Sequence, residues 1–179
     1  LQRYKLDEEK KDKLLQVTLQ ETLRLDSLIN NMLISSQLDV HSYHIEKEEL
    51  NFSDLTKDVA CQFSARYPER QFTHTIQPDI DINGDALLLK LLISNLLENA
   101  NKYSPKEKPV ALVLSKEKEI IKLKVKDQGE GISDEEKKNI FKKFYRIGSE
   151  QTRKAKGTGL GLYLCKKIAE DHSGRITVC

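Results

Sequence analysis

The sequence predicts an α+β fold, with helices on one face of a mainly antiparallel sheet, preceded by a long amphipathic helix. Three observations support this: helical apolar spacing without Gly or Pro over residues 12–38, a hairpin pattern over 110–125, and alternation of helical and strand-like segments elsewhere. The length of 179 residues allows one globular domain and an appendage, but not two full-sized domains. We therefore divide the chain into residues 1–39 and a compact domain over residues 40–179.

The predicted N-terminal helix has an unusually broad apolar stripe. The stripe, with a spacing of three and four, consists of Leu15, Leu19, Thr22, Leu25, Ile29, Met32 and Leu33. Further leucines widen the stripe beyond a two-helix seam, which favours a four-helix bundle. The alternative is that this helix only covers the core of the following domain.

The first half of the compact domain is predicted to contain strand, helix, strand and strand. An alternating stretch after residue 40 indicates a linker that runs into a strand before residue 51. Ser53 or Asp54 can cap a helix that ends near residue 65. Short strands are expected at 72–76 and 80–82, and Asn83-Gly84 is typical of a turn.

The second half begins with a long apolar helix, which Asp85 is expected to cap and Pro105 to terminate. Alternation predicts strands at 110–115 and 120–125, joined by a charged turn. A polar, lysine-rich stretch covers residues 133–156. A helix over about 160–171 and a closing strand at 175–179 complete the prediction.

Composition excludes several classes of protein. The 30 Lys and Arg nearly balance the 28 Asp and Glu, which argues against a surface devoted to nucleic acid. Three cysteines without paired spacing indicate neither a disulfide framework nor a zinc site, and suit a reducing compartment. No stretch has the roughly 18 to 20 apolar residues that span a bilayer, so we expect any membrane segment of the parent protein to lie outside this chain.

Asn95, Asn99 and Lys102 are spaced four and three apart in the apolar helix and therefore share one face. An amide can give its oxygen to Mg²⁺ and its NH₂ group to phosphate, and Lys adds a positive charge. The alternative is a merely solvated polar face. Asn is a mediocre helix former, so its presence in a strongly apolar helix favours a site.

Two glycine clusters contain most of the glycines. Asp127-Gln128-Gly129-Glu130-Gly131-Ile132 follows a strand, where a carboxylate can accept from an exocyclic amine while the glycines admit a flat ligand. Gly157-Thr158-Gly159-Leu160-Gly161-Leu162 opens the last helix, whose N–H groups and dipole favour phosphate. Neither spacing matches a Rossmann or Walker motif, and each cluster alone also fits an ordinary turn or hinge.

The segment between the clusters combines aromatic and basic residues. Phe141 and Phe144 are expected to anchor it in the core, whereas the guanidinium of Arg146 can reach a nearby anion. The surrounding lysines have few aromatic partners. This composition is more typical of a loop that covers phosphate than of a nucleic-acid platform.

In this order, the Asn-rich helix, the D-x-G-x-G turn, the F-x-x-F-Y-R segment and the G-x-G-x-G helix start resemble the ATP-binding boxes of bacterial sensor histidine kinases. The resemblance extends from about Asp12 to the end of the chain. It implies the Bergerat-type (GHKL) fold, a two-layer α/β sandwich with a mixed, mainly antiparallel sheet, shared with gyrase, the Hsp90 chaperones and MutL. It also implies ATP and Mg²⁺ as ligands.

The resemblance implies a role for each matching residue. It assigns Mg²⁺ to Asn99 with Asn95 nearby, phosphate and nucleoside to Lys102 and Tyr103, and the adenine amine to Asp127. It puts Gly129 and Gly131 beneath the base, and Arg146, Gly157, Gly159 and Gly161 around the phosphates. It also assigns Ile132, Thr158, Leu160 and Leu162 to nucleotide binding. The implied catalytic residues are Asn95, Asn99, Lys102 and Arg146. Residues 133–156 match the family's lid over ATP.

Residues 26–38 resemble the second helix of the family's dimerisation and phosphotransfer domain, which implies a homodimer in the parent. His41, His44, His74 and His172 lack the sequence context of the phosphoacceptor, so we expect ATP binding without self-phosphorylation. We also expect the sheet to continue in a further strand beyond Cys179. The implied partner is a response regulator receiver domain, not nucleic acid, and the implied location is the cytoplasmic part of a bacterial inner-membrane sensor.

The leading hypothesis is the ATP-binding part of a kinase that phosphorylates a histidine of its parent and then a response regulator aspartate. An ATPase or chaperone of the same fold is one alternative. Those relatives have a water-activating Glu one turn before the metal-binding Asn, where this chain has Asn95, and Glu98 lies about 100° away around the helix. A nucleotide-binding module without chemistry is the other alternative.

Overall fold

The structure is a computed structural model that describes residues 7–40, 42–148 and 157–179. The chain forms two compact units, Leu1–Tyr43 and His44–Cys179, which are treated separately below. Within the described ranges, no helix combines the length and apolar character needed to cross a membrane.

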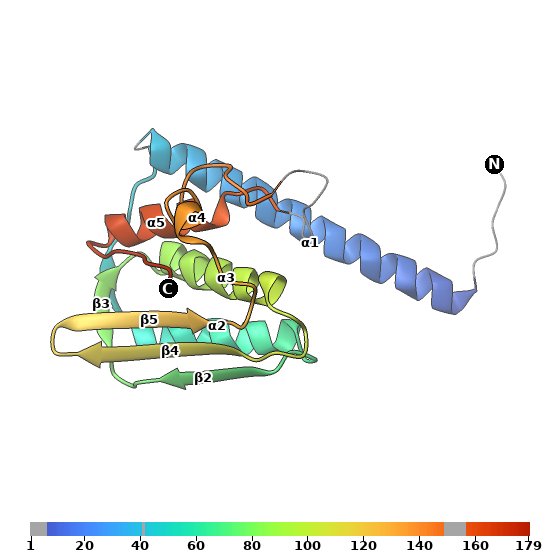
Figure 1. The fold of residues 1–179 in the computed structure, drawn as a ribbon, viewed down its shortest axis with the longest axis horizontal. Helices are drawn as coiled ribbons and strands as arrows, with labels where there is room; N and C mark the ends of the chain where they lie inside the picture. The colour runs from blue at the N-terminus through green and yellow to red at the C-terminus, as the bar shows by residue number, and fades with distance from the viewer. Residues whose placement is uncertain (1–6, 41, 149–156) are drawn as a thin grey trace. The chain divides into compact units, whose positions relative to one another are not determined.

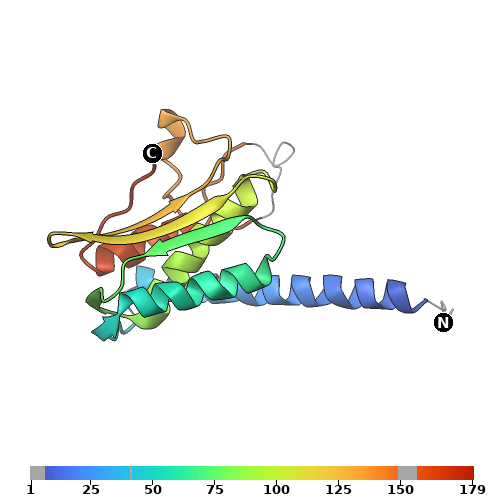
Figure 2. The ribbon, with the colours of Figure 1, turned by 90° about the horizontal axis from the view of Figure 1, so that it is seen from below.

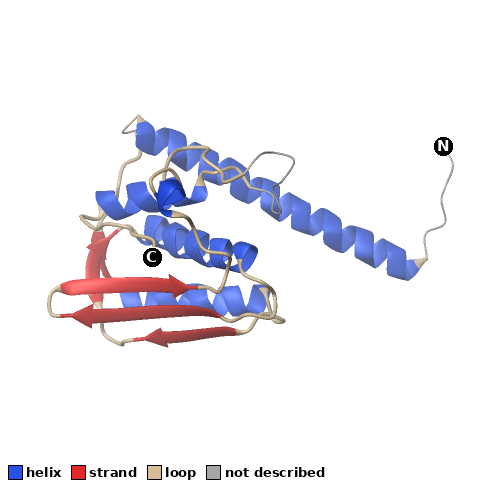
Figure 3. Ribbon diagram, viewed as in Figure 1, coloured by secondary structure: helices blue, strands red, loops and turns tan. Residues whose placement is uncertain are grey.

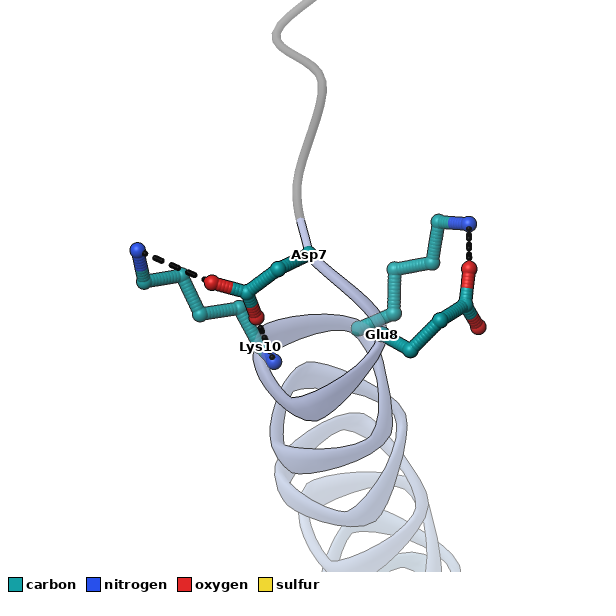
Figure 4. Close-up of polar contacts among 4 residues, drawn as sticks. Asp7, Glu8 and Lys10 are labelled. Carbon is teal, nitrogen blue, oxygen red and sulfur yellow. Dashed lines mark hydrogen bonds and ion pairs between the residues drawn. The ribbon is translucent and has the colours of Figure 1, made fainter.

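The N-terminal unit is one long helix, α1 (Glu8–Asp39), as the apolar spacing predicts. It begins about a turn earlier than that spacing because the Asp7 side chain accepts a hydrogen bond from Lys10 N at 2.8 Å. Figure 4 shows this cap and the ion pair between the Asp7 and Lys10 side chains. Apolar side chains that are more than half exposed on α1 include Leu15, Leu19, Leu25, Ile29, Met32 and Leu33.

The second unit contains two sheets (Figure 3). The larger sheet has the order β2-β4-β5, formed by Phe72–Ile76, Val110–Glu117 and Ile120–Lys126. Strand β2 is parallel to β4, whereas β4 and β5 form the predicted antiparallel hairpin. The smaller sheet pairs β1 (Glu48–Asn51) with β3 (Asp81–Gly84) in antiparallel orientation. The sheet structure is therefore mixed, as predicted.

Helices lie on one side of the larger sheet (Figures 1 and 2). Helices α2 (Phe52–Arg66) and α3 (Ala86–Tyr103) pack against its strands, and α5 (Gly161–Asp171) packs against α3. The short helix α4 (Asp134–Lys137) is capped by Ser133. Fully buried side chains of the core include Leu88, Ile93, Leu97, Leu112, Leu114, Leu164 and Ile168. The predicted α+β class, a two-layer α/β sandwich, is confirmed.

Asn83-Gly84 does not form the predicted turn but belongs to β3, where Gly84 pairs with Glu48. Gly84 is buried, and a Cβ atom there would lie 2.7 Å from Leu89 Cδ1 and 3.0 Å from His172 Cδ2. The sequence has glycine here because the packing leaves no room for a side chain.

Two further local predictions are wrong. Asn51 caps α2 by accepting from Asp54 N at 2.9 Å, whereas Ser53 Oγ donates to Gln77 O at 2.6 Å and accepts from Ile80 N at 3.0 Å. Residues 175–179 form no strand, because no ladder hydrogen bonds pair them with a neighbour among the described residues. The alternation of side chains in this segment is typical of a strand, but a strand also needs backbone hydrogen bonds to a neighbouring strand.

Candidate functional site

Helix α3 carries four predicted site residues, and its start is fixed by Asp85. The Asp85 carboxylate accepts from Leu88 N at 3.1 Å, which confirms the predicted cap, and from Glu46 N at 3.3 Å. Asp85 N donates to His172 Nε2 at 2.9 Å, and His172 Nδ1 lies 2.8 Å from Ile168 O. The first turn of α3 is thus joined to the last turn of α5.

The Asn95 and Asn99 side chains both lie beside the first residue of α5. A Cβ atom at Gly161 would lie 3.0 Å from Asn95 Oδ1 and 3.8 Å from Asn99 Nδ2. Asn95 Nδ2 donates to Leu91 O at 3.0 Å, which orients this amide. Glycine at position 161 therefore allows the backbone to approach both amides closely.

Helix α5 begins without a side-chain cap. Its N-cap residue, Leu160, is almost fully buried and has no polar atom that could accept from the first N–H groups of the helix. Because those N–H groups form the positive end of the helix dipole, the start of α5 favours an anion. Thr158 and Leu162, on either side of this start, are half-buried.

Lys102 extends the polar face of α3 towards the second glycine cluster. A Cβ atom at Gly157 would lie 2.5 Å from Lys102 Nζ, and the same ammonium lies 4.7 Å from the centroid of the Tyr103 ring. The Tyr103 side chain is 55% exposed. The fold therefore brings three predicted residues of α3 together with two glycines that are more than 50 positions later in the sequence.

The D-x-G-x-G turn lies against the C-terminal end of α3. Asp127 Oδ1 accepts from Gly129 N at 2.8 Å, and Gln128 N donates to Ser104 Oγ at 3.4 Å. A Cβ atom at Gly129 would lie 2.8 Å from Tyr103 O, so this turn packs directly on the backbone of α3. Asp127 is exposed, and Ile132, at the end of the cluster, is half-buried.

Phe144 is not the core anchor that the sequence predicts. Its side chain is 56% exposed and its φ is +63°, whereas the nearby Ile140 is only 5% exposed. Phe144 N donates to Gly159 O at 3.1 Å, so this segment contacts the second glycine cluster through its backbone. Phe141 is half-buried. The aromatic spacing predicted burial, but the left-handed backbone turns Phe144 outward.

Tyr145 and Lys143 hold the same segment to its surroundings. Tyr145 Oη donates to Glu136 Oε2 at 2.5 Å, and this bond raises the pKa of Tyr145. Lys143 Nζ lies 5.8 Å from the centroid of the Tyr163 ring on α5. Arg146 is half-buried. The remainder of the predicted lid, residues 149–156, lies outside the described residues.

Residues 84–179, more than half of the chain, match the family described as Histidine kinase-, DNA gyrase B-, and HSP90-like ATPase. The chain belongs to this family. Its domain over residues 84–179 is therefore an ATP-binding domain, and the order of the boxes along the chain fits this family.

The chain is also similar to individual kinases of this ATPase family. It is 30% identical over 172 residues to the sensor protein KdpD of Clostridium acetobutylicum, which covers 96% of this chain and 19% of KdpD. It is 31% identical over 174 residues to the sensor histidine kinase WalK of Bacillus subtilis, which covers 90% of this chain and 27% of WalK. The chain thus spans less than a third of either relative.

Among solved structures, the catalytic domain of histidine kinase ThkA is similar, with a TM-score of 0.61 and 27% sequence identity. The match covers 71% of this chain and 82% of that chain. This similarity agrees with the fold class derived from the sequence.

Glu98, about 100° around α3 from Asn99, contacts the end of α2. Its carboxylate accepts from Arg66 Nη1 at 2.8 Å and from Tyr67 Oη at 2.7 Å. A general base must reach the proton that it abstracts. Glu98 is therefore engaged in joining α2 to α3, and hydrolysis through this carboxylate is disfavoured.

The Tyr67 hydroxyl should make the free energy of unfolding fall at alkaline pH. Burial, together with the bond to Glu98, raises the pKa of Tyr67 to about 12, so the folded state retains a proton that the unfolded state loses near pH 10. This contribution is complete below about pH 10 and is lost as the pH rises towards 12. Tyr67→Phe should lower the free energy of unfolding by about 1 kcal/mol at pH 8. The difference from the unsubstituted chain should shrink above pH 10.

Urea unfolding of both proteins between pH 8 and 12 measures this difference. Tyr103→Phe, which changes an exposed tyrosine, provides the control and should give a constant difference. If the difference in unfolding free energy between Tyr67→Phe and the unsubstituted chain also stays constant with pH, the Tyr67 hydroxyl is not the source of the pH dependence.

The described residues contain no group of three or more His, Cys, Asp or Glu side chains that could hold a metal ion. A metal at this site would therefore depend on an amide oxygen and on oxygens of the nucleotide. This donor set suits Mg²⁺, which commonly binds through one or two protein groups, water and phosphate oxygens.

Proposed function

We propose that this chain is the ATP-binding catalytic part of a bacterial sensor histidine kinase. In the parent protein, the γ-phosphoryl group of ATP would pass to a histidine and then to an aspartate of a response regulator. The observation that carries the proposal is the close approach of Asn95 and Asn99 to Gly161, because it joins an amide face to an uncapped helix start. The similarity to KdpD and WalK supports it.

Asn99 is the proposed Mg²⁺ ligand, and Asn95 lies on the same face of α3. When bound, Mg²⁺ would supply positive charge to the β- and γ-phosphates. Lys102 adds a second charge beside Gly157, and Arg146 is proposed to reach the same phosphates. These residues act by positioning and electrostatic stabilisation, which is the main requirement of phosphoryl transfer.

The proposed phosphate-binding residues also include Thr158, Gly159, Leu160 and Leu162 around the start of α5. Because the Leu160 side chain is buried, its contribution would come from the backbone. An anion beside the first N–H groups of α5 would complete the hydrogen bonding of that helix.

The nucleoside is proposed to lie at the C-terminal end of α3, beside the D-x-G-x-G turn. Asp127 would accept from the adenine amine, with Gly129, Gly131 and Ile132 beneath the base. Gly131 has a φ of +75°, and no heavy atom lies within 4 Å of the place where its Cβ would be, so a flat ligand can approach this side of the backbone. The exposed ring of Tyr103 provides an apolar surface at the same end of α3.

The acceptor histidine is proposed to belong to another segment of the parent. His172 is bonded to Asp85 and Ile168, and His44 and His74 are exposed without an acceptor context. We propose that α1, with its exposed apolar stripe, is the second helix of the bundle through which the parent forms a homodimer. The chain would then be the cytoplasmic part of an inner-membrane sensor, with a response regulator receiver domain as its partner.

Calorimetric titration with ATP and Mg²⁺ tests the nucleotide site. Asp127→Asn should weaken ATP binding by about 10- to 100-fold, the effect of losing a hydrogen bond to a charged acceptor. Asp58→Asn, which makes the same change on the exposed face of α2, is the matched control and should bind as the parent chain does. Absence of binding to the parent chain at millimolar ATP would contradict the proposal.

Phosphate transfer separates the kinase from its two alternatives. With γ-labelled ATP and a supplied acceptor-helix fragment, the label should move to the histidine of that fragment. Repeated phosphate release without an acceptor would instead identify a hydrolase. ATP binding with neither transfer nor release would identify a nucleotide-binding module without chemistry.

A further inference from the structure

Arg70 is a charged residue that the fold buries. It belongs to the segment of chain that connects α2 to β2, and only 8% of its surface is exposed. Its Nη1 donates to Pro105 O at 2.5 Å, and its Nη2 lies 3.3 Å from both Ala100 O and Ser104 O. Arginine is rarely buried to this extent unless it is paired. Here its partners are three carbonyl oxygens rather than a carboxylate.

These carbonyls determine how α3 ends. Ala100 O accepts the last backbone bond of the helix, from Ser104 N at 3.1 Å, and Pro105 O lies in the turn that follows. A cation at a helix C-terminus is favourable because it satisfies carbonyl groups at the negative end of the dipole. The planar guanidinium has several donors in a fixed geometry, so it can hold three oxygens at defined positions.

The same end of α3 supports the D-x-G-x-G turn. The Ser104 carbonyl accepts from Arg70, while the Ser104 hydroxyl accepts from Gln128 N. The neighbouring Tyr103 O lies where a side chain at position 129 would be. Arg70 is thus separated from the turn by one residue, although it is 57 positions away from Asp127 in the sequence.

We propose that Arg70 is a positioning residue that sets the distance between α3 and the turn containing Asp127, and thereby sets selectivity for adenine. The inference rests on the proposed function, in which Asp127 accepts from the adenine amine. Arg70 acts through Ser104 and Tyr103 and does not contact the nucleotide. Its influence is therefore directed to the base and not to the triphosphate.

The experiment compares ATP with inosine triphosphate, which has a carbonyl in place of the exocyclic amine. Dissociation constants of both nucleotides are measured by calorimetry with Mg²⁺ for the unsubstituted chain (called the parent chain below), Arg70→Met and Arg70→Lys. Arg70→Met should weaken ATP binding about tenfold and leave inosine triphosphate nearly unchanged, so that the selectivity ratio collapses. Arg70→Lys, which keeps a donor and the charge, should restore part of the ratio.

Two controls separate positioning from general stability. Arg66→Met removes an exposed arginine of α2 and should leave the ratio unchanged. Ser104→Ala breaks only the bond to Gln128 N, and should lower the ratio even if Arg70→Met does not fold. Equal weakening of both nucleotides in Arg70→Met, or a parent-like ratio in both Arg70→Lys and Ser104→Ala, would overturn the proposal.

Failure of the proposed ATP-binding function can be distinguished from failure of the proposed role of Arg70. If the parent chain binds neither nucleotide, the proposed ATP site is wrong and the inference falls with it. If the parent chain prefers ATP and the variants keep the same preference, only the role of Arg70 is wrong.

Discussion

Replacing Gly159 with alanine is expected to lower the free energy of unfolding far more than the same change at Gly131. Both glycines have a φ of +75°. An alanine in that region costs about 1 to 2 kcal/mol at either position. At Gly159, however, the new Cβ would lie 2.6 Å from the Phe144 carbonyl carbon and 2.7 Å from Tyr145 O, whereas nothing lies within 4 Å at Gly131.

Because backbone atoms cannot rotate away as a side chain can, the clash at Gly159 should add about 1 to 3 kcal/mol of overpacking strain. Urea unfolding of the two variants measures the difference directly, since the φ penalty is common to both. ATP affinity should also fall in Gly159→Ala, because the hydrogen bond from Phe144 N to Gly159 O would be broken. Equal destabilisation of the two variants would show that this contact contributes nothing.

Gly161→Val is expected to weaken ATP binding by about 100-fold or more while leaving α5 folded. The Cβ atom itself would lie 3.0 Å from Asn95 Oδ1, and the two added methyl groups would enter the space between Asn95 and Asn99. Overpacking of this kind costs about 1 to 3 kcal/mol, and the displaced amides would no longer face a bound nucleotide.

Gly161→Ala gives a graded test of the same contact. Alanine is the better helix former by about 1 kcal/mol, so this variant should not be less stable, yet it should bind ATP more weakly. Lys166→Val places valine on the exposed side of α5 and measures the cost of a β-branched residue together with the loss of the 3.8 Å ion pair to Glu170. A drop in affinity that follows the loss of stability across all three variants would contradict the steric explanation.

Elements with strong local signals could be predicted from the sequence. Asp85 followed by an apolar helix gave the cap that the structure contains, and alternation gave the β4–β5 hairpin. At the turn of that hairpin, Lys118 adopts a φ of +55°. Periodicity and capping are sufficient in these places because the determining contacts lie within a few residues of one another.

Features that depend on distant contacts could not be predicted. Arg70 has no motif around it, and its partners are backbone carbonyls that become its neighbours only after α2 and α3 pack. Gly84 appeared to mark a turn because its actual constraint, the ring of His172, comes from the other end of the domain. Phe144 had an apolar spacing typical of the core, but its left-handed backbone is visible only in the structure.

The roles of the site residues follow from the family resemblance, whereas their juxtaposition follows from the packing of α5 on α3. Single amides such as Asn95 and Asn99 have no specific signature in isolation, because solvated asparagines are common on helices. Their closeness to Gly161 depends on a helix pairing that joins residues more than 60 positions apart.

Helix α3 is held at both of its ends by side chains from outside it. His172 binds the backbone at its start and Arg70 binds the carbonyls at its end. Ordinary helices lose their terminal turns first, and the amide hydrogens there exchange with solvent through local fraying. With both ends fastened, we expect the amides of α3 to exchange only when the packing of the domain opens as a whole. The polar face of this helix would then be a rigid template, and adjustment to a ligand would fall to the segments around it.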